Sequence, residues 1–284
     1  MFQCCTTDKG LSYKVYPEQE ASVNLQKTPI VLAHGLFGSK GLFDSVCKQI
    51  SRDGRKVFAY DARNHGDSEK SVEFTYSCMA DDLNDFIDNQ GLTQPIVMGH
   101  SMGGKTAMTL ALAKPQKLKA LIAIDIAPIK SPTKDKFVEY AHAMKALSFP
   151  TDTSLNESKA WAKKELLNTV QDEQILDYLL TNLIVDEKGQ VKWRHVLDAF
   201  VNNSDQLSFL EPQNRPFTKP ALFVFGEKSE HYRSEGLEKV ETYFPNAEVR
   251  PIKDSGHFLY DDKPAEFVSV VQRFCNSLDG RYQF

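Results

Sequence analysis

The chain has 284 residues, of which 41% are hydrophobic and 25% are charged, a composition typical of a globular protein. Its formal net charge of −4, from 34 basic and 38 acidic residues, lacks the basic excess that a nucleic-acid-binding surface needs, so we expect no nucleic-acid partner. The longest apolar runs, such as Ala120–Pro128, are too short to cross a bilayer, so we expect no transmembrane segment.

Short apolar runs alternate with helical patterns along most of the chain. The N-terminal segment, 1–28, contains a predicted antiparallel edge strand at Leu11–Tyr16. The further predicted strands are Ile30–His34, Val57–Asp61, Ile96–Gly99, Leu121–Ile126, Ala221–Phe225 and Ala247–Ile252. The predicted helices between them are Phe43–Arg52, Tyr76–Asn89, Met102–Ala113, Gly236–Phe244 and Pro264–Leu278. Strands that are apolar on both faces and alternate with helices indicate a mostly parallel sheet covered by helices on both sides.

One stretch, 131–215, departs from this alternation. Its helical patterns follow one another without a convincing parallel strand. Apolar residues recur there at helical spacing, first over Phe137–Leu147 and again over Trp193–Phe200. Prolines mark both junctions of the stretch. We interpret it as a helical cap inserted into a core that consists of residues 29–130 and 216–284.

The strongest local signal is Gly99-His100-Ser101-Met102-Gly103, which follows a predicted strand and opens a predicted helix. In α/β-hydrolases a G-x-S-x-G motif in this context places a nucleophilic serine on a sharp turn. The turn strains the serine backbone, and the glycines relieve crowding where strand and helix nearly touch. Backbone N–H groups at the start of the helix favour developing negative charge. We therefore expect Ser101 to form an acyl-enzyme and the N–H of Met102 to bind the oxyanion.

A second oxyanion donor is expected from His34-Gly35-Leu36-Phe37-Gly38, the loop that closes the first apolar strand. Its two glycines let the backbone approach a substrate closely. The N–H of Leu36 is the first choice for this donor, and the N–H of Phe37 is the second. Two preorganised donors aimed at one oxygen stabilise the transition state of acyl transfer strongly.

His257 is the predicted general base. It lies in Asp254-Ser255-Gly256-His257-Phe258, between the last predicted strand and the last predicted helix. The histidine of the triad comes last in chain order in α/β-hydrolases, on a loop of this kind. It would take the proton of the Ser101 hydroxyl and return it to the leaving group.

The acid of the triad has alternatives. Its commonest place, after the strand Ala221–Phe225, offers Glu227 and Glu230 but no aspartate. Asp125 stands one strand earlier, inside an apolar run, where a carboxylate is costly to bury unless it is paired. A hydrogen bond to the imidazole of His257 would offset that cost, so Asp125 is favoured over both glutamates. Without a catalytic role, Asp125 would cap the first helix of the cap.

The chain resembles the α/β-hydrolase domain-containing protein eleven family, the sn-1-specific diacylglycerol lipase and esterase branch of the α/β-hydrolases, in the segments HGLFGSK, DARNHGDS, GHSMGGKTAM, AIDIAP and SGH. The resemblance runs from about Pro29 to Phe274, over core and cap. It implies the α/β-hydrolase fold, with a mostly parallel sheet of the eight-stranded type, helices on both faces and an inserted helical cap. Members of the branch take their acid from one strand early, which supports Asp125.

The resemblance also implies a function and a cellular context. It implies a serine esterase or lipase that cleaves acylglycerols or other acyl esters, which are small-molecule substrates. It implies a mitochondrial location, and an association of animal members with the 2-oxoglutarate dehydrogenase complex. The N-terminus shows no conventional leader, which keeps a cytoplasmic location as the alternative.

Three functions are compatible with these residues. The first is ester hydrolysis through an acyl-enzyme, and the second is an acyltransferase in which an alcohol replaces water. The third is a non-catalytic protein that binds an acyl group or a partner and protects a mitochondrial dehydrogenase complex. A serine triad needs no metal or organic cofactor. The side chains expected either to line an acyl pocket or to form the core of the cap are Phe37, Phe137, Tyr140, Met144, Trp161 and Trp193.

Overall fold

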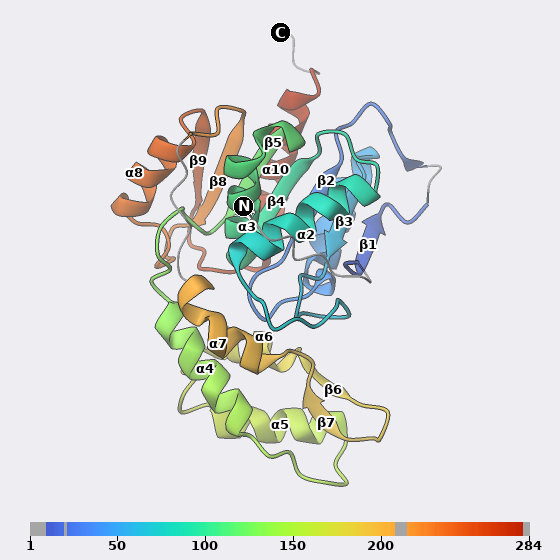
Figure 1. Ribbon diagram of the computed structural model, residues 1–284, viewed down its shortest axis with the longest axis vertical. Coiled ribbons are helices and arrows are strands. Elements are labelled where there is room, and N and C mark those ends of the chain that lie inside the picture. Colours follow the sequence, from blue (N-terminus) through green and yellow to red (C-terminus); the bar gives the residue numbers. More distant parts are fainter. Residues whose placement is uncertain (1–9, 20–21, 208–214, 281–284) are drawn as a thin grey trace.

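The computed structural model describes residues 10–19, 22–207 and 215–280. Its centre is a seven-stranded sheet in the order β1-β3-β2-β4-β5-β8-β9 (Figure 1). β1 (Tyr13–Tyr16) pairs antiparallel with β3, and the other pairings in this sheet are parallel. The parallel strands are β2 (Ile30–Ala33), β3 (Val57–Tyr60), β4 (Ile96–His100), β5 (Ala120–Ile124), β8 (Ala221–Gly226) and β9 (Ala247–Ile252).

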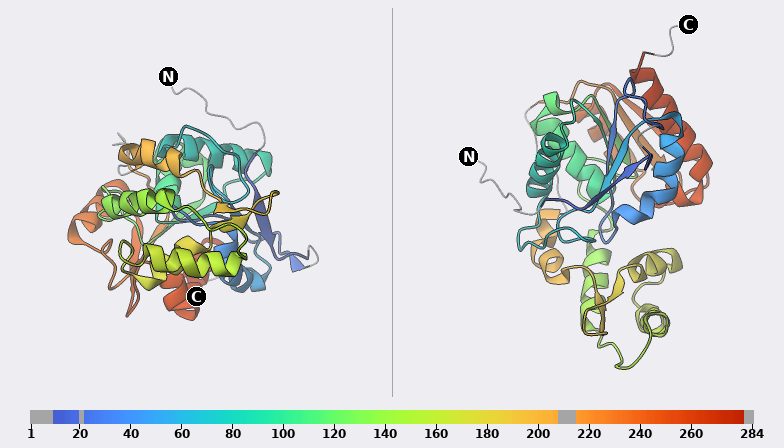
Figure 2. Two further views of the ribbon diagram at one scale, coloured as in Figure 1. Left: turned by 90° about the horizontal axis from the view of Figure 1, so that it is seen from below. Right: turned by 90° about the vertical axis from the view of Figure 1, so that its right-hand side faces the viewer.

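Helices cover both faces of the sheet (Figure 2). Every residue of β2, β3, β4, β5 and β8 is buried, as the apolar runs of the sequence predict for parallel strands between two helical layers. One layer contains α2 and α3, and the other contains α1 and α10. The helices of the core are α1 (Asp44–Ile50), α2 (Tyr76–Asn89), α3 (Met102–Ala113), α8 (Ser234–Tyr243), α9 (Leu259–Asp262) and α10 (Pro264–Leu278).

The predicted mostly parallel sheet with one antiparallel edge strand is confirmed. The described sheet has seven strands, however, and not the eight of the expected type. Among the described residues before β2, β1 is the one strand, so the described sheet has a single antiparallel strand at this edge. None of the described helices has both the length and the apolar character that a membrane span requires.

The cap lies beyond the carboxyl ends of the parallel strands (Figure 1). Its elements are α4 (Lys134–Ala146), α5 (Leu155–Leu166), α6 (Glu173–Leu180), β6 (Leu183–Val185), β7 (Val191–Trp193) and α7 (Leu197–Leu207). The antiparallel hairpin of β6 and β7 corrects the helical interpretation of Trp193–Phe200. Trp193 ends β7, and helix α7 begins only at Leu197. The spacing of four apolar residues indicates a helix but does not locate its first residue.

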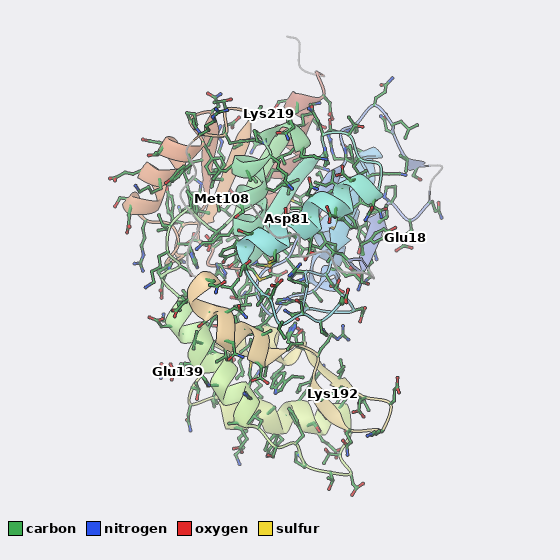
Figure 3. All side chains as sticks on the ribbon, in the orientation of Figure 1. Glu18, Asp81, Met108, Glu139, Lys192 and Lys219 are labelled. Carbon is green, nitrogen blue, oxygen red and sulfur yellow. The ribbon has the colours of Figure 1, made fainter. Side chains whose placement is uncertain are left out.

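Sheet and cap share one hydrophobic cluster. It includes Leu32 and Ile122 from the sheet together with Met144 and Leu176 from the cap. Figure 3 shows side chains filling the space between the elements, with Met108 of α3 inside the packed core. The cap is therefore packed as part of the same core and is fixed over one edge of the sheet.

Strand β4 and helix α3 approach each other so closely that glycine is required at their junction. A Cβ atom at Gly99 would lie 2.2 Å from the carbonyl oxygen of Gly103. A Cβ atom at Gly103 would lie 2.4 Å from the carbonyl oxygen of Ala33 in β2. These contacts involve backbone, which cannot move aside cheaply, and they fix the turn that presents Ser101.

Replacing Gly99 by alanine should therefore destabilise the protein. We expect Gly99→Ala to lower the free energy of unfolding by about 2–3 kcal/mol, because the added methyl group overpacks the junction. Gly41→Ala is the matched control, since a Cβ atom there meets the Ser39 hydroxyl oxygen at 3.8 Å. That control should change the free energy by less than about 0.5 kcal/mol. Chemical denaturation measures both values, and equal effects would contradict this account of the junction.

Candidate active site

Ser101 occupies the turn between β4 and α3. Its backbone has φ 51° and ψ −112°, a conformation that side-chain-bearing residues rarely adopt. The turn is held because the Ser101 N–H donates to the carbonyl oxygen of Ile124, 3.0 Å away, at the end of β5. The strain predicted from the G-x-S-x-G motif is thus present, and the serine side chain lines a cavity.

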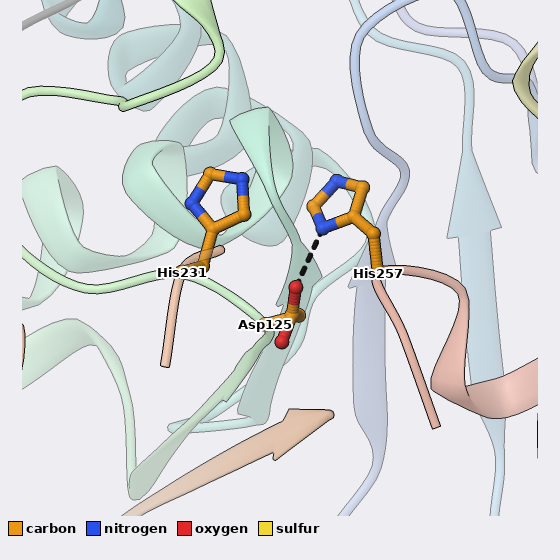
Figure 4. Close-up of side chains that lie close together, drawn as sticks. All are labelled: Asp125, His231 and His257. Carbon is orange, nitrogen blue, oxygen red and sulfur yellow. Dashed lines mark hydrogen bonds and ion pairs between the residues drawn. The ribbon is translucent and has the colours of Figure 1, made fainter. Parts of the chain in front are cut away.

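Asp125 and His257 contact each other directly. The Nδ1 atom of His257 lies 2.6 Å from Oδ2 of Asp125 (Figure 4). Asp125 is fully buried directly after β5, and its other oxygen accepts a hydrogen bond from the Gly226 N–H at 2.9 Å. The Ser229 hydroxyl also donates to Oδ2. These donors replace the water that the carboxylate loses on burial, and they aim it at the imidazole.

The two alternative acids lie elsewhere. Glu227 is exposed, and its carboxylate accepts a hydrogen bond from the backbone N–H of Asp254 at 3.2 Å. Glu230 is exposed too and forms an ion pair of 2.7 Å with Lys136 of the cap. Of the three candidate carboxylates, Asp125 is therefore the one that contacts His257.

Ser101 and His257 line the same cavity. No direct hydrogen bond joins them within the described part of the chain, and such contacts commonly tighten only when a substrate is bound. The two residues are nevertheless held together indirectly. His100, the neighbour of Ser101, contacts the carbonyl oxygen of His257 through Nε2 at 3.0 Å. The loop that carries His257 is thereby fixed to the end of β4.

The N–H groups of Leu36 and Met102 have no acceptor among the described residues. The carbonyl oxygen of Gly35 contacts Nδ1 of His34 at 2.8 Å and accepts from the N–H of Gly38 at 2.9 Å. In a trans peptide the N–H points away from the carbonyl, so the Leu36 N–H is directed away from these partners. Leu36 and Met102 both line the cavity at Ser101, which leaves their donors available to a substrate oxygen.

Phe37 is wrong as the second choice of oxyanion donor. Its N–H donates to Nε2 of His65 at 3.0 Å, and its carbonyl oxygen accepts from the Asn182 side chain at 2.6 Å. The residue has φ 59° and turns its ring into the core, where it is 1% exposed. Both polar backbone groups are consequently occupied, and no local sequence pattern indicates these distant partners.

Two cap residues hold this loop, although no sequence pattern indicates them. The Tyr178 hydroxyl donates to the carbonyl oxygen of Leu36 at 2.8 Å, and Asn182 holds Phe37 as described. Tyr178 lies on α6, and Asn182 follows it before β6. No motif links them to the loop, because the partners are separated by 142 and 145 residues in the chain.

Two cavities adjoin the imidazole of His257. The first, the Ser101 cavity, has a volume of about 50 Å³. Apolar side chains on its wall are Leu36, Met102, Ile126, Phe137, Phe200, Leu207 and Phe258. The second, the His257 cavity, has a volume of about 520 Å³ and is lined by Tyr140 and Ile175 together with many polar residues. Of the predicted pocket residues, Phe137 lines both cavities and Tyr140 lines the second.

The other predicted pocket residues line neither cavity. Met144 is fully buried in the cap, and Phe37 packs edge-on against Phe200 with ring centroids 5.2 Å apart. The remaining two are Trp161 and Trp193, whose rings each pack against Phe149 at 5.7 Å. Their large apolar surfaces stabilise the cap itself.

Three buried histidines support the oxyanion loop. The ring centroids of His34 and His65 are 5.0 Å apart, and those of His65 and His195 are 4.7 Å apart. Burial lowers the pKa of all three, that of His195 to about 3. The neutral rings can accept hydrogen bonds, and Nε2 of His34 does so from the N–H of Ala62 at 3.0 Å.

One group of described residues has the placement of metal ligands. Asp125, His231 and His257 each offer an atom, and these atoms lie within 4.8 Å of one another (Figure 4). Two of the three are joined by the Asp125–His257 hydrogen bond, which a metal ion would have to replace. The arrangement as it stands orients an imidazole and leaves its Nε2 atom for proton transfer.

Comparison with known proteins agrees with this geometry. Residues 28–264 match the family described as alpha/beta hydrolase fold. The chain belongs to the α/β-hydrolase family. This α/β-hydrolase is 36% identical over 246 residues to the sn-1-specific diacylglycerol lipase ABHD11 of Mus musculus, which covers 86% of this chain and 80% of the relative. It is 32% identical to a probable alcohol acetyltransferase of Saccharomyces cerevisiae, over 87% of this chain and 77% of the relative.

A solved structure shows the same likeness. The structure of a marine microorganism esterase superposes with a TM-score of 0.85 at 30% identity, over 93% of this chain and 99% of that one. The family resemblance expected from the sequence motifs is thus confirmed, as is the α/β-hydrolase fold. The chain is accordingly a carboxylic ester hydrolase by class.

The buried histidines should make this α/β-hydrolase less stable in acid. In the unfolded chain His195 is protonated below about pH 6.5, whereas in the folded chain its pKa is about 3. Between these two pH values the unfolded chain therefore binds one more proton than the folded chain. The free energy of unfolding should therefore fall as the pH decreases through this window, with His195 contributing about 1.4 kcal/mol per pH unit. Denaturation curves between about pH 7 and pH 4 measure the slope.

The variant His195→Asn should have a slope smaller by about one proton. His142→Asn, at an exposed position of α4, is the matched control and should keep the slope of the wild type. An unchanged slope in His195→Asn would contradict the assignment of this acid sensitivity to the buried ring.

Proposed function

We propose that this α/β-hydrolase cleaves carboxylic esters of lipids, acylglycerols among them, through an acyl-enzyme on Ser101. The observation that carries the proposal is the 2.6 Å contact between Asp125 and His257 beside the cavity that Ser101 lines. The mouse relative is named a diacylglycerol lipase, and the similar solved structure is named an esterase. Both names support an ester of an acyl group as the substrate class.

The reaction follows from the placement of these groups. The Ser101 hydroxyl oxygen attacks the ester carbonyl carbon while Nε2 of His257 takes the hydroxyl proton. Asp125 holds the opposite nitrogen of the ring and stabilises the imidazolium. The carbonyl electron pair moves to the oxygen, where the N–H groups of Leu36 and Met102 bind the negative charge.

Collapse of this intermediate releases the alcohol. The electron pair returns to the carbon, the bond to the alcohol oxygen breaks, and His257 gives its proton to that oxygen. A water molecule then attacks the acyl-enzyme and loses a proton to His257. The second intermediate collapses, the bond to the Ser101 oxygen breaks, and the carboxylic acid leaves as the serine recovers its proton.

An acyltransferase is the second candidate function. The observation in its favour is the similarity to a probable alcohol acetyltransferase of Saccharomyces cerevisiae. The acyl-enzyme would be the same, and an alcohol in place of water would accept the acyl group. The ratio of ester product to free acid in the presence of added alcohol measures the partition between the two reactions.

The cellular context stays a prediction from the sequence resemblance. A mitochondrial location, a role in lipid metabolism and an association with the 2-oxoglutarate dehydrogenase complex belong together in that prediction. The non-catalytic, protective role at the complex is the corresponding alternative to hydrolysis. Co-purification of the complex with the Ser101→Ala variant would support such a role, because that variant lacks the nucleophile.

The choice of acid can be tested by one pair of variants. Asp125→Asn should lower kcat for ester hydrolysis by about 10⁴-fold, the loss seen in serine proteases, because asparagine favours the wrong imidazole tautomer. Glu227→Gln is the matched control and should retain the activity of the wild type. Initial rates on a p-nitrophenyl ester measure both, with circular dichroism as the check of folding. Full activity in Asp125→Asn, or no ester hydrolysis by the wild type, would contradict the proposed function.

A further inference from the structure

The two cavities meet at the imidazole that performs the proton transfers. His257 lines both of them, as do Thr133, Phe137 and Phe258. The cavities differ about tenfold in volume, about 50 Å³ for the Ser101 cavity and about 520 Å³ for the His257 cavity. They therefore suit two substrate parts of very different size.

We propose that the Ser101 cavity holds a short acyl group and the His257 cavity holds a bulky, polar, uncharged alcohol. The preferred substrates are then esters of acids with about two to five carbons, and among the acylglycerols of the proposed function those with short acyl chains. This assignment rests on the proposed acyl-enzyme function and adds to it the size and polarity of each half of the substrate.

The positions of the reacting groups decide which half of the substrate lies in which cavity. Ser101 and the oxyanion donors of Leu36 and Met102 line the Ser101 cavity and are absent from the wall of the His257 cavity. The acyl carbon and its oxygen must therefore lie in the Ser101 cavity. The leaving oxygen must receive its proton from His257, so the alcohol projects past the imidazole. On that side lies the His257 cavity, where His231 stacks on His257 with ring centroids 4.7 Å apart.

The volume of the Ser101 cavity limits the acyl chain. A water-sized group needs about 10–15 Å³ of this kind of space, so about 50 Å³ holds roughly three to five such groups. A methylene group is similar in size to a water molecule. The wall includes Phe200 and Leu207 of α7, which are buried and belong to the common hydrophobic cluster. Longer chains would have to displace this packing.

The His257 cavity has a polar wall. Uncharged hydrogen-bonding residues on it are Asn168, Thr169, Gln171, Gln174 and Ser229. Both lysines on the wall are paired with carboxylates, Lys136 with Glu230 at 2.7 Å and Lys228 with Asp254 at 2.9 Å. Three carboxylates on the wall, Glu139, Asp172 and Glu230, outnumber the two lysines, so the wall disfavours an anionic alcohol. Its amide and hydroxyl groups suit a neutral alcohol with several hydroxyl or amide groups.

A series of acyl lengths tests the first half of the proposal. The values of kcat/KM for p-nitrophenyl esters from acetate to dodecanoate should peak at about two to five carbons and fall at least about tenfold by eight carbons. Phe200→Leu and Leu207→Ala enlarge the Ser101 cavity and should move the peak to longer chains. Leu167→Ala is the matched control, because Leu167 is 46% exposed on the cap and lies outside both cavities.

A series of alcohols tests the second half. With butyrate as the acid, glucose monobutyrate should be a better substrate than methyl butyrate. Ile175→Trp narrows the His257 cavity and should lower the ratio of kcat/KM for the glucose ester to kcat/KM for the methyl ester about tenfold or more. Circular dichroism establishes that each variant is folded.

The results separate this inference from the proposed function. Activity that stays in Ser101→Ala, or no ester hydrolysis at all, would overturn both. Hydrolysis that depends on Ser101 but rises through acyl chains of eight to twelve carbons would overturn the inference alone. Equal effects of Ile175→Trp on kcat/KM for both esters would contradict the placement of the alcohol in the His257 cavity.

Discussion

The hydrogen bond between Asp125 and His257 joins two loops that are 132 residues apart in the chain. It can form because β5, β8 and β9 are neighbours in the sheet, so the loops after β5 and β9 leave the same edge. Burial of the carboxylate would be costly without partners. The Gly226 N–H, the Ser229 hydroxyl and the imidazole supply them, so stability of the loop and orientation of the base depend on the same interaction.

The cap contributes to the site through the oxyanion loop as well as through the cavity walls. Tyr178 and Asn182 bind the carbonyl oxygens of Leu36 and Phe37, and His65 binds the Phe37 N–H. These contacts fix the peptides on both sides of Phe37 and leave the Leu36 N–H as the donor on this loop. The sheet therefore positions the reacting side chains, while the cap and the buried histidines position the backbone that would bind the developing charge.

Local signals in the sequence predicted the parts of the site that depend on local geometry. The glycines around Ser101 predicted the turn, and the buried aspartate in an apolar run predicted a partner for His257. The occupied N–H of Phe37 could not be predicted, because its acceptor His65 lies 28 residues away. The hydrogen bond from the Ser229 hydroxyl to Asp125 could not be predicted either. Hydrogen bonds between distant segments leave no spacing pattern in the sequence.

The aromatic residues of the cap show a different limit. Trp161 and Trp193 are large aromatic residues of the kind that can line an acyl pocket, yet both pack on Phe149 inside the cap. The spacing of apolar residues indicates that one face of a helix is apolar, but it does not indicate whether that face contacts a ligand or another helix. The fold was more predictable, because fully apolar strands between helices have few alternatives to a parallel sheet.

The proposed chemistry requires that Ser101 carries the acyl group during turnover. The most direct measurement is mass spectrometry of the protein quenched in acid during hydrolysis of a p-nitrophenyl ester, followed by peptide mapping. A mass increase of one acyl group is expected on the peptide that contains Ser101, and none is expected in Ser101→Ala. Hydrolysis by the wild type with the acyl group on another residue, or with an undiminished rate in Ser101→Ala, would contradict this chemistry.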